Sequence, residues 1–359
     1  MSAAKSPAKP RAPRKPAKKR INIALQGGGA HGAFTWGVLD RLLSDEHLEI
    51  CAISGTSAGA LNGAALKAGL TEGRDGAKAN LEWLWDTVTA AGDLRISDWV
   101  NTLFPSPKMF GQVVETSLQI SMAEAATRIF SPYSYGPFYR NPLYKIVDGF
   151  RYDRVCAGEG PPLFVSCTNV RSGKIRVFTG KEISSDVIVA SACLPTLFQA
   201  VEFEDPKTGK IEAFWDGGYT GNPALFPLFD QALPDDIVIV NINPLERPDL
   251  PLSSQDILNR INEVSFNSSL LRELRAIRFV KDLIAKGKVE DGAMKDVLIH
   301  MIADDSIMQD LNVATKMVPT AYLVDKLRDA GAAAADRFLT AHRDKINKSS
   351  SVDLKAMYE

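Results

Sequence analysis

Ser57 lies in a stretch whose residue types are those of a nucleophile. The five residues Gly55-Thr56-Ser57-Ala58-Gly59 fit the pattern G-x-S-x-G, in which the glycines let the chain turn so tightly that the serine oxygen projects from the end of a strand. The alternative is an ordinary glycine-rich loop between a strand and a helix, because so short a pattern often arises by chance. The rest of the chain has to decide between these interpretations.

A second glycine-rich stretch, Gly27-Gly28-Gly29-Ala30-His31-Gly32, follows the first predicted strand. Formally it satisfies the dinucleotide-binding pattern G-x-G-x-x-G, but the second predicted strand ends in Ser54-Gly55 and lacks the acidic residue that would bind a ribose. The glycines could instead present backbone N–H groups at a helix N-terminus, where they would stabilise the oxyanion formed when a serine attacks an ester carbonyl.

A serine with an ordinary pKa needs a base that accepts its proton. The chain has four histidines, His31, His47, His300 and His342. The last two follow the candidate acid in chain order but lie outside glycine-rich turns, so we expect no Ser-His-Asp triad and interpret them as a structural and a helix-surface residue. Asp216, which stands between an apolar pair and Gly217-Gly218, is the better candidate base, although Asp-Gly is also a common turn.

Alternating strand and helix patterns surround these turns. Strands at 21–26 and 50–54 each lead into a glycine turn and a helix, which is typical of an α/β fold with a parallel sheet. Further strands are predicted at 163–168, 175–178, 211–215, 237–242 and 297–302, and helices at 33–44, 58–68, 186–193, 255–288 and 319–343. Because ligands bind at the carboxyl ends of strands in such sheets, we expect the turns at 27–32, 55–59 and 216–218 to converge on one crevice.

Two further segments have alternative interpretations. Aromatic residues scattered through 80–150 either fill core space or form a cap over an apolar pocket. The helix predicted at 255–288 could lie on a membrane, but such a helix more often packs on its own sheet with its arginines in solvent. Its apolar stripe consists of Ile257, Ile261, Val264, Leu271, Leu274 and Ile277.

Composition is that of an ordinary globular protein. With 359 residues, 45% of them hydrophobic, the chain can bury a large core. It lacks the run of about 18 apolar residues that a transmembrane helix needs. Four cysteines, Cys51, Cys156, Cys167 and Cys193, lie far apart without C-x-x-C spacing, which indicates reduced thiols and no zinc site. We expect a cytoplasmic protein without a metal or other cofactor.

Residues 1–20 differ from the rest in charge. They hold eight Lys or Arg and no acid, so the remainder of the chain carries a net charge of -9. With four prolines and no apolar run, the tail is expected to be disordered. A basic tail can contact anionic lipid or nucleic acid, although a solubilising extension is the commoner case. We expect no specific nucleic-acid partner, and peripheral membrane contact stays open.

Four motifs in order resemble those of the patatin-like phospholipases. The family motifs G-G-G-x-K/R-G, G-x-S-x-G, A-S-x-x-x-P and D-G-G/A correspond to Gly27–Gly32, Gly55–Gly59, Ala190–Pro195 and Asp216–Gly218. Four motifs in the right order are far more specific than any one of them. One residue departs from the family: His31 replaces Lys or Arg, and because its charge depends on pH, its effect on the glycine loop stays open.

The resemblance implies a three-layer α/β/α patatin-like fold with a mostly parallel central sheet, related to α/β-hydrolase architecture. It implies Ser57 as nucleophile, Asp216 as base, and an oxyanion hole drawn from Gly27, Gly28 and Gly29. Motif residues that would support them are His31, Gly32, Gly55, Gly59, Gly217 and Gly218. The implied activity is that of a carboxylic ester hydrolase of phospholipase A, lysophospholipase or esterase type, acting on a lipid or other acyl ester through an acyl-serine.

Two alternatives to this function stay open. One is a non-catalytic protein that binds a nucleotide or anion with the glycine loop, and the other is a lipid-surface scaffold. We predict a single domain at 21–345 between the basic tail and a polar tail at 346–359. Within it we distinguish a motif-bearing core at 21–243, a cap-like insertion at about 80–150 and a helical extension at 255–345. Nothing in the sequence indicates an oligomeric state.

Overall fold

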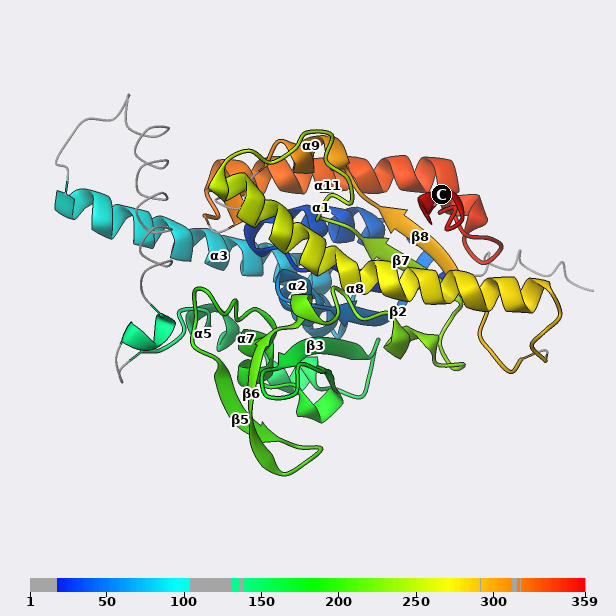
Figure 1. The fold of residues 1–359 in the computed structure, drawn as a ribbon, viewed down its shortest axis with the longest axis horizontal. Coiled ribbons are helices and arrows are strands. Elements are labelled where there is room, and N and C mark those ends of the chain that lie inside the picture. The colour runs from blue at the N-terminus through cyan, green and yellow to red at the C-terminus, as the bar shows by residue number, and fades with distance from the viewer. Residues whose placement is uncertain are drawn as a thin grey trace, which may run out of the picture.

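The computed structural model describes residues 18–103, 131–135, 139–290, 292–311, 315–316 and 318–358. Within them lies an eight-stranded sheet in the order β5-β6-β3-β2-β1-β7-β8, with β4 paired to β3 (Figure 1). The strands are β1 (Lys19–Leu25), β2 (Leu48–Gly55), β3 (Leu163–Asn169), β4 (Ile175–Thr179), β5 (Val201–Asp205), β6 (Lys210–Asp216), β7 (Asp236–Val240) and β8 (Leu298–Ile302). Pairing is parallel from β3 through β2, β1 and β7 to β8, and antiparallel for β4, β5 and β6. The predicted mostly parallel sheet is confirmed.

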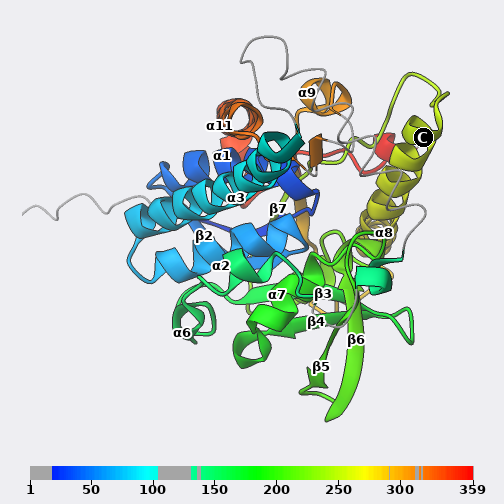
Figure 2. The ribbon, with the colours of Figure 1, turned by 90° about the vertical axis from the view of Figure 1, so that its left-hand side faces the viewer.

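Helices cover both faces of the sheet. The long helices α1 (Gly32–Leu43), α2 (Ala58–Leu70), α3 (Arg74–Leu103) and α11 (Ala321–His342) lie on one face and α8 (Ser254–Ala285) on the other (Figure 2). The shorter helices are α5 (Tyr144–Val147), α6 (Tyr152–Val155), α7 (Ser185–Ser191) and α9 (Asp305–Gln309). Along β1, Ile23 and Leu25 belong to the core shared with α1 and α2, while Ala24 belongs to the core under α8, as the two-residue period of a strand requires. The fold therefore has three layers, as expected.

The element boundaries differ from the sequence-based ones mainly at the edges of the sheet. β1 begins at Lys19, two residues before the predicted start of order. β5 was not predicted, because three of its five residues are acidic. It is nevertheless a strand that pairs antiparallel with β6, with Val201 and Asp205 buried at its two ends.

The amphipathic helix α8 packs along only part of its length. Leu274 and Ile277 are buried in the core under this helix, whereas Ile257, Ile261 and Val264 are 43 to 56% exposed. The interpretation that the stripe packs on its own sheet is therefore correct for the second half of α8 and wrong for the first half. Periodicity alone could not separate the halves, because it shows which side chains share a face and not what that face meets.

Much of the aromatic insertion predicted at 80–150 lies outside the described residues, as do residues 1–17 of the basic tail. Trp85 is buried and its Nε1 donates to Asn62 Oδ1 at 3.0 Å, so this aromatic fills core space. The short segment at 131–135 lies against the chain leading into β5, where Gln199 Nε2 donates to the Pro132 carbonyl at 3.2 Å. No described helix has the length and apolar character needed to cross a bilayer.

The polar segment at 346–358 is packed against the sheet. His300 is fully buried in β8, with Nε2 2.9 Å from Asp236 Oδ1 and Nδ1 3.1 Å from Ser351 Oγ. Asp236 also accepts the backbone N–H of Asn347 at 2.8 Å. His300 therefore ties the end of the chain to β7 and β8, which supports its interpretation as a structural residue.

Candidate active site

Ser57 sits on a sharp turn between the end of β2 and the start of α2. Its φ of 54° and ψ of −124° are strained for a residue with a side chain. Bonds from distant segments hold the turn: Thr56 Oγ1 donates to the Gly221 carbonyl at 2.7 Å, and the Ser57 N–H donates to Ser191 Oγ at 2.9 Å. Such strain persists only where the surroundings fix the backbone. The fixed backbone keeps the side chain of Ser57 at the end of β2.

Asp216 ends β6 and is only 1% exposed. Its Oδ1 accepts the Gly218 N–H at 2.7 Å, and the Ser57 hydroxyl lies near enough to the carboxyl group to lower its pKa. Burial raises the pKa of Asp216 to about 7, while the bonds from Gly218 and Ser57 act in the opposite direction. The two candidate catalytic residues are thus brought together, with a carboxylate that titrates near neutral pH.

The first glycine turn lies directly beside Ser57. A Cβ on Gly27 would come within 2.5 Å of Ser57 Cβ, and one on Gly217 within 3.0 Å of Thr56 Cγ2, so the three glycine turns converge as predicted. The Gly27 N–H donates to Asn222 Oδ1 at 2.7 Å. Within the described part of the chain, no hydrogen bond to protein takes up the N–H of Gly28 or Gly29. Of the three loop glycines, Gly27 therefore has an N–H that is already paired with a protein acceptor.

A buried amide network fixes the glycine loop. Gln26 Oε1 accepts the N–H groups of Ile242 and Asn243 at 2.9 and 3.1 Å, and its Nε2 donates to the Asn222 carbonyl at 3.2 Å. Asn243 Nδ2 donates to the Gly27 carbonyl at 2.8 Å. Sequence reasoning missed these amides. Their one signal was position, because Gln26 and Asn243 follow the carboxyl ends of β1 and β7, where ligands gather in such sheets.

His31 is held in the same loop as a buried, neutral side chain. It is 2% exposed and its Nε2 lies 2.8 Å from Thr315 Oγ1. Burial lowers its pKa well below the ordinary value, and the charges of Lys316 and Arg247 lower it further. The imidazole therefore carries no charge at neutral pH. Among the described residues, no histidine hydrogen bonds to Ser57 or Asp216.

Residues 23–229 match the family model described as "Patatin-like phospholipase". The chain belongs to the patatin-like phospholipase family. That membership implies lipid acyl hydrolase activity. A crystal structure of VipD from Legionella pneumophila is matched with a TM-score of 0.39 and 15% sequence identity over 91% of this chain and 67% of that one. A comparison with curated proteins gave no match.

The remaining glycines of the patatin motifs all sit where a side chain would not fit. A Cβ on any of them would come within 2.1 to 3.0 Å of a neighbouring atom; they are Gly32, Gly55, Gly59, Gly217 and Gly218. Contacts this close require a neighbour to shift. The patatin glycines therefore allow the turns to approach one another.

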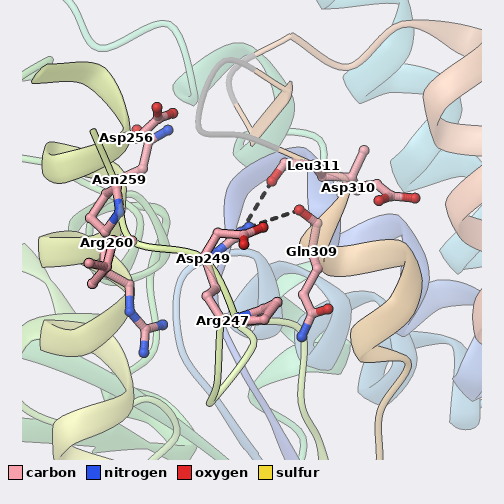
Figure 3. A pocket seen from close by; sticks show the side chains of 11 residues that line it. Arg247, Asp249, Asp256, Asn259, Arg260, Gln309, Asp310 and Leu311 are labelled. Carbon is pink, nitrogen blue, oxygen red and sulfur yellow. Dashed lines mark hydrogen bonds between the residues drawn. The ribbon is translucent and has the colours of Figure 1, made fainter. Parts of the chain in front are cut away.

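A cavity of about 460 Å³ lies between the loop after β7 and the start of α8 of this patatin domain (Figure 3). Arg247, Asp256, Arg260 and Asp310 are among its lining residues, and neither Ser57 nor Asp216 is. Arg247 donates to the carbonyls of Gln309 and Leu311 at 2.8 and 3.2 Å. Within the described ranges no cluster of three His, Cys, Asp or Glu side chains is placed to hold a metal ion.

Replacing Gly29 of the patatin loop by alanine is expected to destabilise the protein. Its φ is +59°, and a Cβ there would lie 2.3 Å from the Lys316 carbonyl oxygen. Gly180 is the matched control, since its φ is +55° with nothing within 4 Å. The left-handed backbone alone costs about 1 kcal/mol, which Gly180→Ala should show in urea unfolding. Gly29→Ala should lose a further ~2 kcal/mol through overpacking. Equal losses in the two variants would contradict the close packing of Lys316 on this loop.

Proposed function

We propose that this protein is a carboxylic ester hydrolase of lipid acyl esters that uses Ser57 as nucleophile and Asp216 as general base. The observation that carries the proposal is the position of the Ser57 hydroxyl beside a buried carboxyl group, that of Asp216, whose pKa is raised to about 7. An exposed carboxylate is a weak base, whereas one with a pKa near the working pH accepts a proton effectively. Neither a histidine nor a metal is needed for the step.

The reaction begins when Ser57 Oγ attacks the ester carbonyl and its proton passes to Asp216. The negative charge that develops on the carbonyl oxygen is stabilised by the N–H groups of Gly28 and Gly29, together with the positive end of α2, which begins just after Ser57. As the C–O bond to the alcohol breaks, Asp216 returns the proton to the leaving oxygen. The product of this half is an acyl-serine at Ser57.

The second half releases the fatty acid. Water gives a proton to Asp216 and attacks the acyl carbonyl, and the same N–H groups stabilise the second oxyanion. When the bond to Ser57 breaks, the proton on Asp216 passes back to Ser57 Oγ. The cycle returns both residues to their starting states, so one base serves both halves.

Two alternatives receive less support from the site. A nucleotide-binding role for the glycine loop would need an acidic side chain at the end of β2, and Ser54, which stands there, donates to the Ala224 carbonyl at 2.5 Å. A lipid-surface role would rest on the basic residues 1–20, of which 1–17 lie outside the described ranges, and on the amphipathic helix α8, whose first half exposes Ile257, Ile261 and Val264. Full binding to anionic vesicles by a chain lacking residues 1–20 would rule out such a role for the tail.

Labelling by a fluorophosphonate tests the proposal directly, because such reagents phosphonylate an activated serine. We expect stoichiometric modification, with loss of ester hydrolysis, and peptide mass mapping should place the adduct on Ser57. Ser172 is a suitable internal comparison, since it is an exposed serine in the β3–β4 turn with no adjacent base. An adduct on another serine, or full hydrolysis by the labelled protein, would contradict the proposal.

A further inference from the structure

Lys316 lies against the glycine loop although it is far away in the sequence. Its backbone carbonyl oxygen would lie 2.3 Å from a Cβ placed on Gly29, and the preceding Thr315 contacts His31. The Lys316 side chain extends under the loop, where Nζ donates to Asn243 Oδ1 at 2.8 Å. As a whole residue Lys316 is partly exposed, but this bond places its ammonium end beside a fully buried amide.

Asn243 connects that ammonium group to the candidate oxyanion donor. While Oδ1 accepts from Lys316, Nδ2 of the same amide donates to the Gly27 carbonyl at 2.8 Å and to Gln26 Oε1 at 3.1 Å. The Gly27 carbonyl and the Gly28 N–H belong to one peptide unit, so a hydrogen bond accepted at the carbonyl polarises that unit and makes the N–H a stronger donor. A cation behind Asn243 strengthens this effect and fixes which way its amide points.

We propose that Lys316 is a positioning residue for catalysis, which acts through Asn243 to orient and polarise the Gly28 N–H that stabilises the oxyanion. The inference rests on the proposed hydrolase function. Because His31 is buried and neutral, the inference takes Lys316 as the residue that supplies positive charge beside this loop.

The surroundings of Lys316 contain charges of both signs. Glu263 of α8 is the acidic group that favours the charged lysine, but it is already paired with Arg247 and Arg260 at 2.7 and 3.4 Å. Arg247 disfavours the charged form, and His31 faces the same region without charge. Burial is the largest effect and lowers the pKa of Lys316 to about 8. The lysine is charged below that pH and loses its charge above it.

Two substitutions separate charge from structure. Lys316→Met keeps most of the volume without the charge, and we expect kcat for a soluble short-chain p-nitrophenyl ester to fall about tenfold, with KM changed less than twofold. Deleting an oxyanion-hole donor typically lowers kcat about 10²–10³-fold. The loss expected here is smaller, because the Gly28 N–H remains in place. Lys316→Arg keeps the charge at all accessible pH values and should retain most of kcat. In wild type kcat should fall above about pH 8, and in Lys316→Arg this fall should move upward.

Lys295 provides the matched control. It is a lysine whose Nζ donates to the carbonyls of Asp230 and Leu233, both at 2.7 Å, and burial lowers its pKa too. Lys295→Met should lower thermal stability and leave kcat and its pH profile unchanged. The inference is overturned if folded Lys316→Met keeps kcat within twofold of wild type. If Lys316→Met does not fold, an alkaline fall in Lys316→Arg that is identical to wild type overturns it.

These outcomes are distinguishable from failure of the proposed function. If fluorophosphonate labels Ser57 and hydrolysis depends on Ser57, an inert Lys316 counts against Lys316 alone. If Ser57 is neither labelled nor needed, the hydrolase mechanism itself is wrong, and the Lys316 inference is wrong with it.

Discussion

Replacing Ser57 by alanine is expected to lower kcat for acyl-ester hydrolysis on the order of 10⁵-fold, because losing the nucleophile removes the acyl-enzyme route entirely. The variant should fold normally, since alanine keeps the Cβ and requires no new space in the turn. Its strained backbone, with φ of 54°, is fixed by bonds that the hydroxyl does not make. The measurement is steady-state kinetics on a soluble ester, alongside thermal unfolding of the same preparation.

Ser172→Ala is the matched control for this experiment. Ser172 is exposed in the turn between β3 and β4, and its hydroxyl bonds within that turn, donating to Asn169 Oδ1 at 2.9 Å and accepting the Lys174 N–H at 3.3 Å. Its replacement should leave kcat unchanged. Hydrolysis by Ser57→Ala within tenfold of wild type would show that another residue is the nucleophile.

Replacing Asp216 by asparagine is expected to lower kcat about 10²–10⁴-fold, the usual contribution of a positioned general base. In wild type the rate should fall tenfold per pH unit below about pH 7, because Asp216 is protonated there and cannot accept the Ser57 proton. The residual rate of Asp216→Asn should lack this acid limb. A pH series of kcat/KM for both proteins measures the effect.

Stability gives an independent check on the same carboxyl group. Burial raises the folded pKa of Asp216 above its ordinary value of 3.8. The stabilising contribution of the protonated form is therefore fully present below about pH 3.8 and is lost as the pH rises through about 7. Asp216→Asn should accordingly melt at a higher temperature than wild type at pH 8. A wild-type acid limb near pH 4, or a less stable variant at pH 8, would contradict the raised pKa.

The sheet and its glycine turns could be predicted from the sequence because their determinants are local. The apolar run in β7 and the strand–glycine–helix order around Gly27 and Ser57 each identify an element within about a dozen residues. The acid-rich β5 was missed, because its pairing with β6 and not its own pattern makes it a strand. The first half of α8 was misjudged for a related reason: helical periodicity does not reveal what a face packs against.

The sequence by itself determined which residues are chemically able to act: a serine in an elbow, an aspartate before two glycines, and a glycine loop. Only the tertiary structure decided which groups surround those residues. Burial at the end of β6 raises the pKa of Asp216, Asn222 takes up the N–H of Gly27, and Lys316 stands behind Asn243. Burial and hydrogen bonding of this kind depend on groups from separate strands and loops. A local sequence pattern therefore does not reveal them.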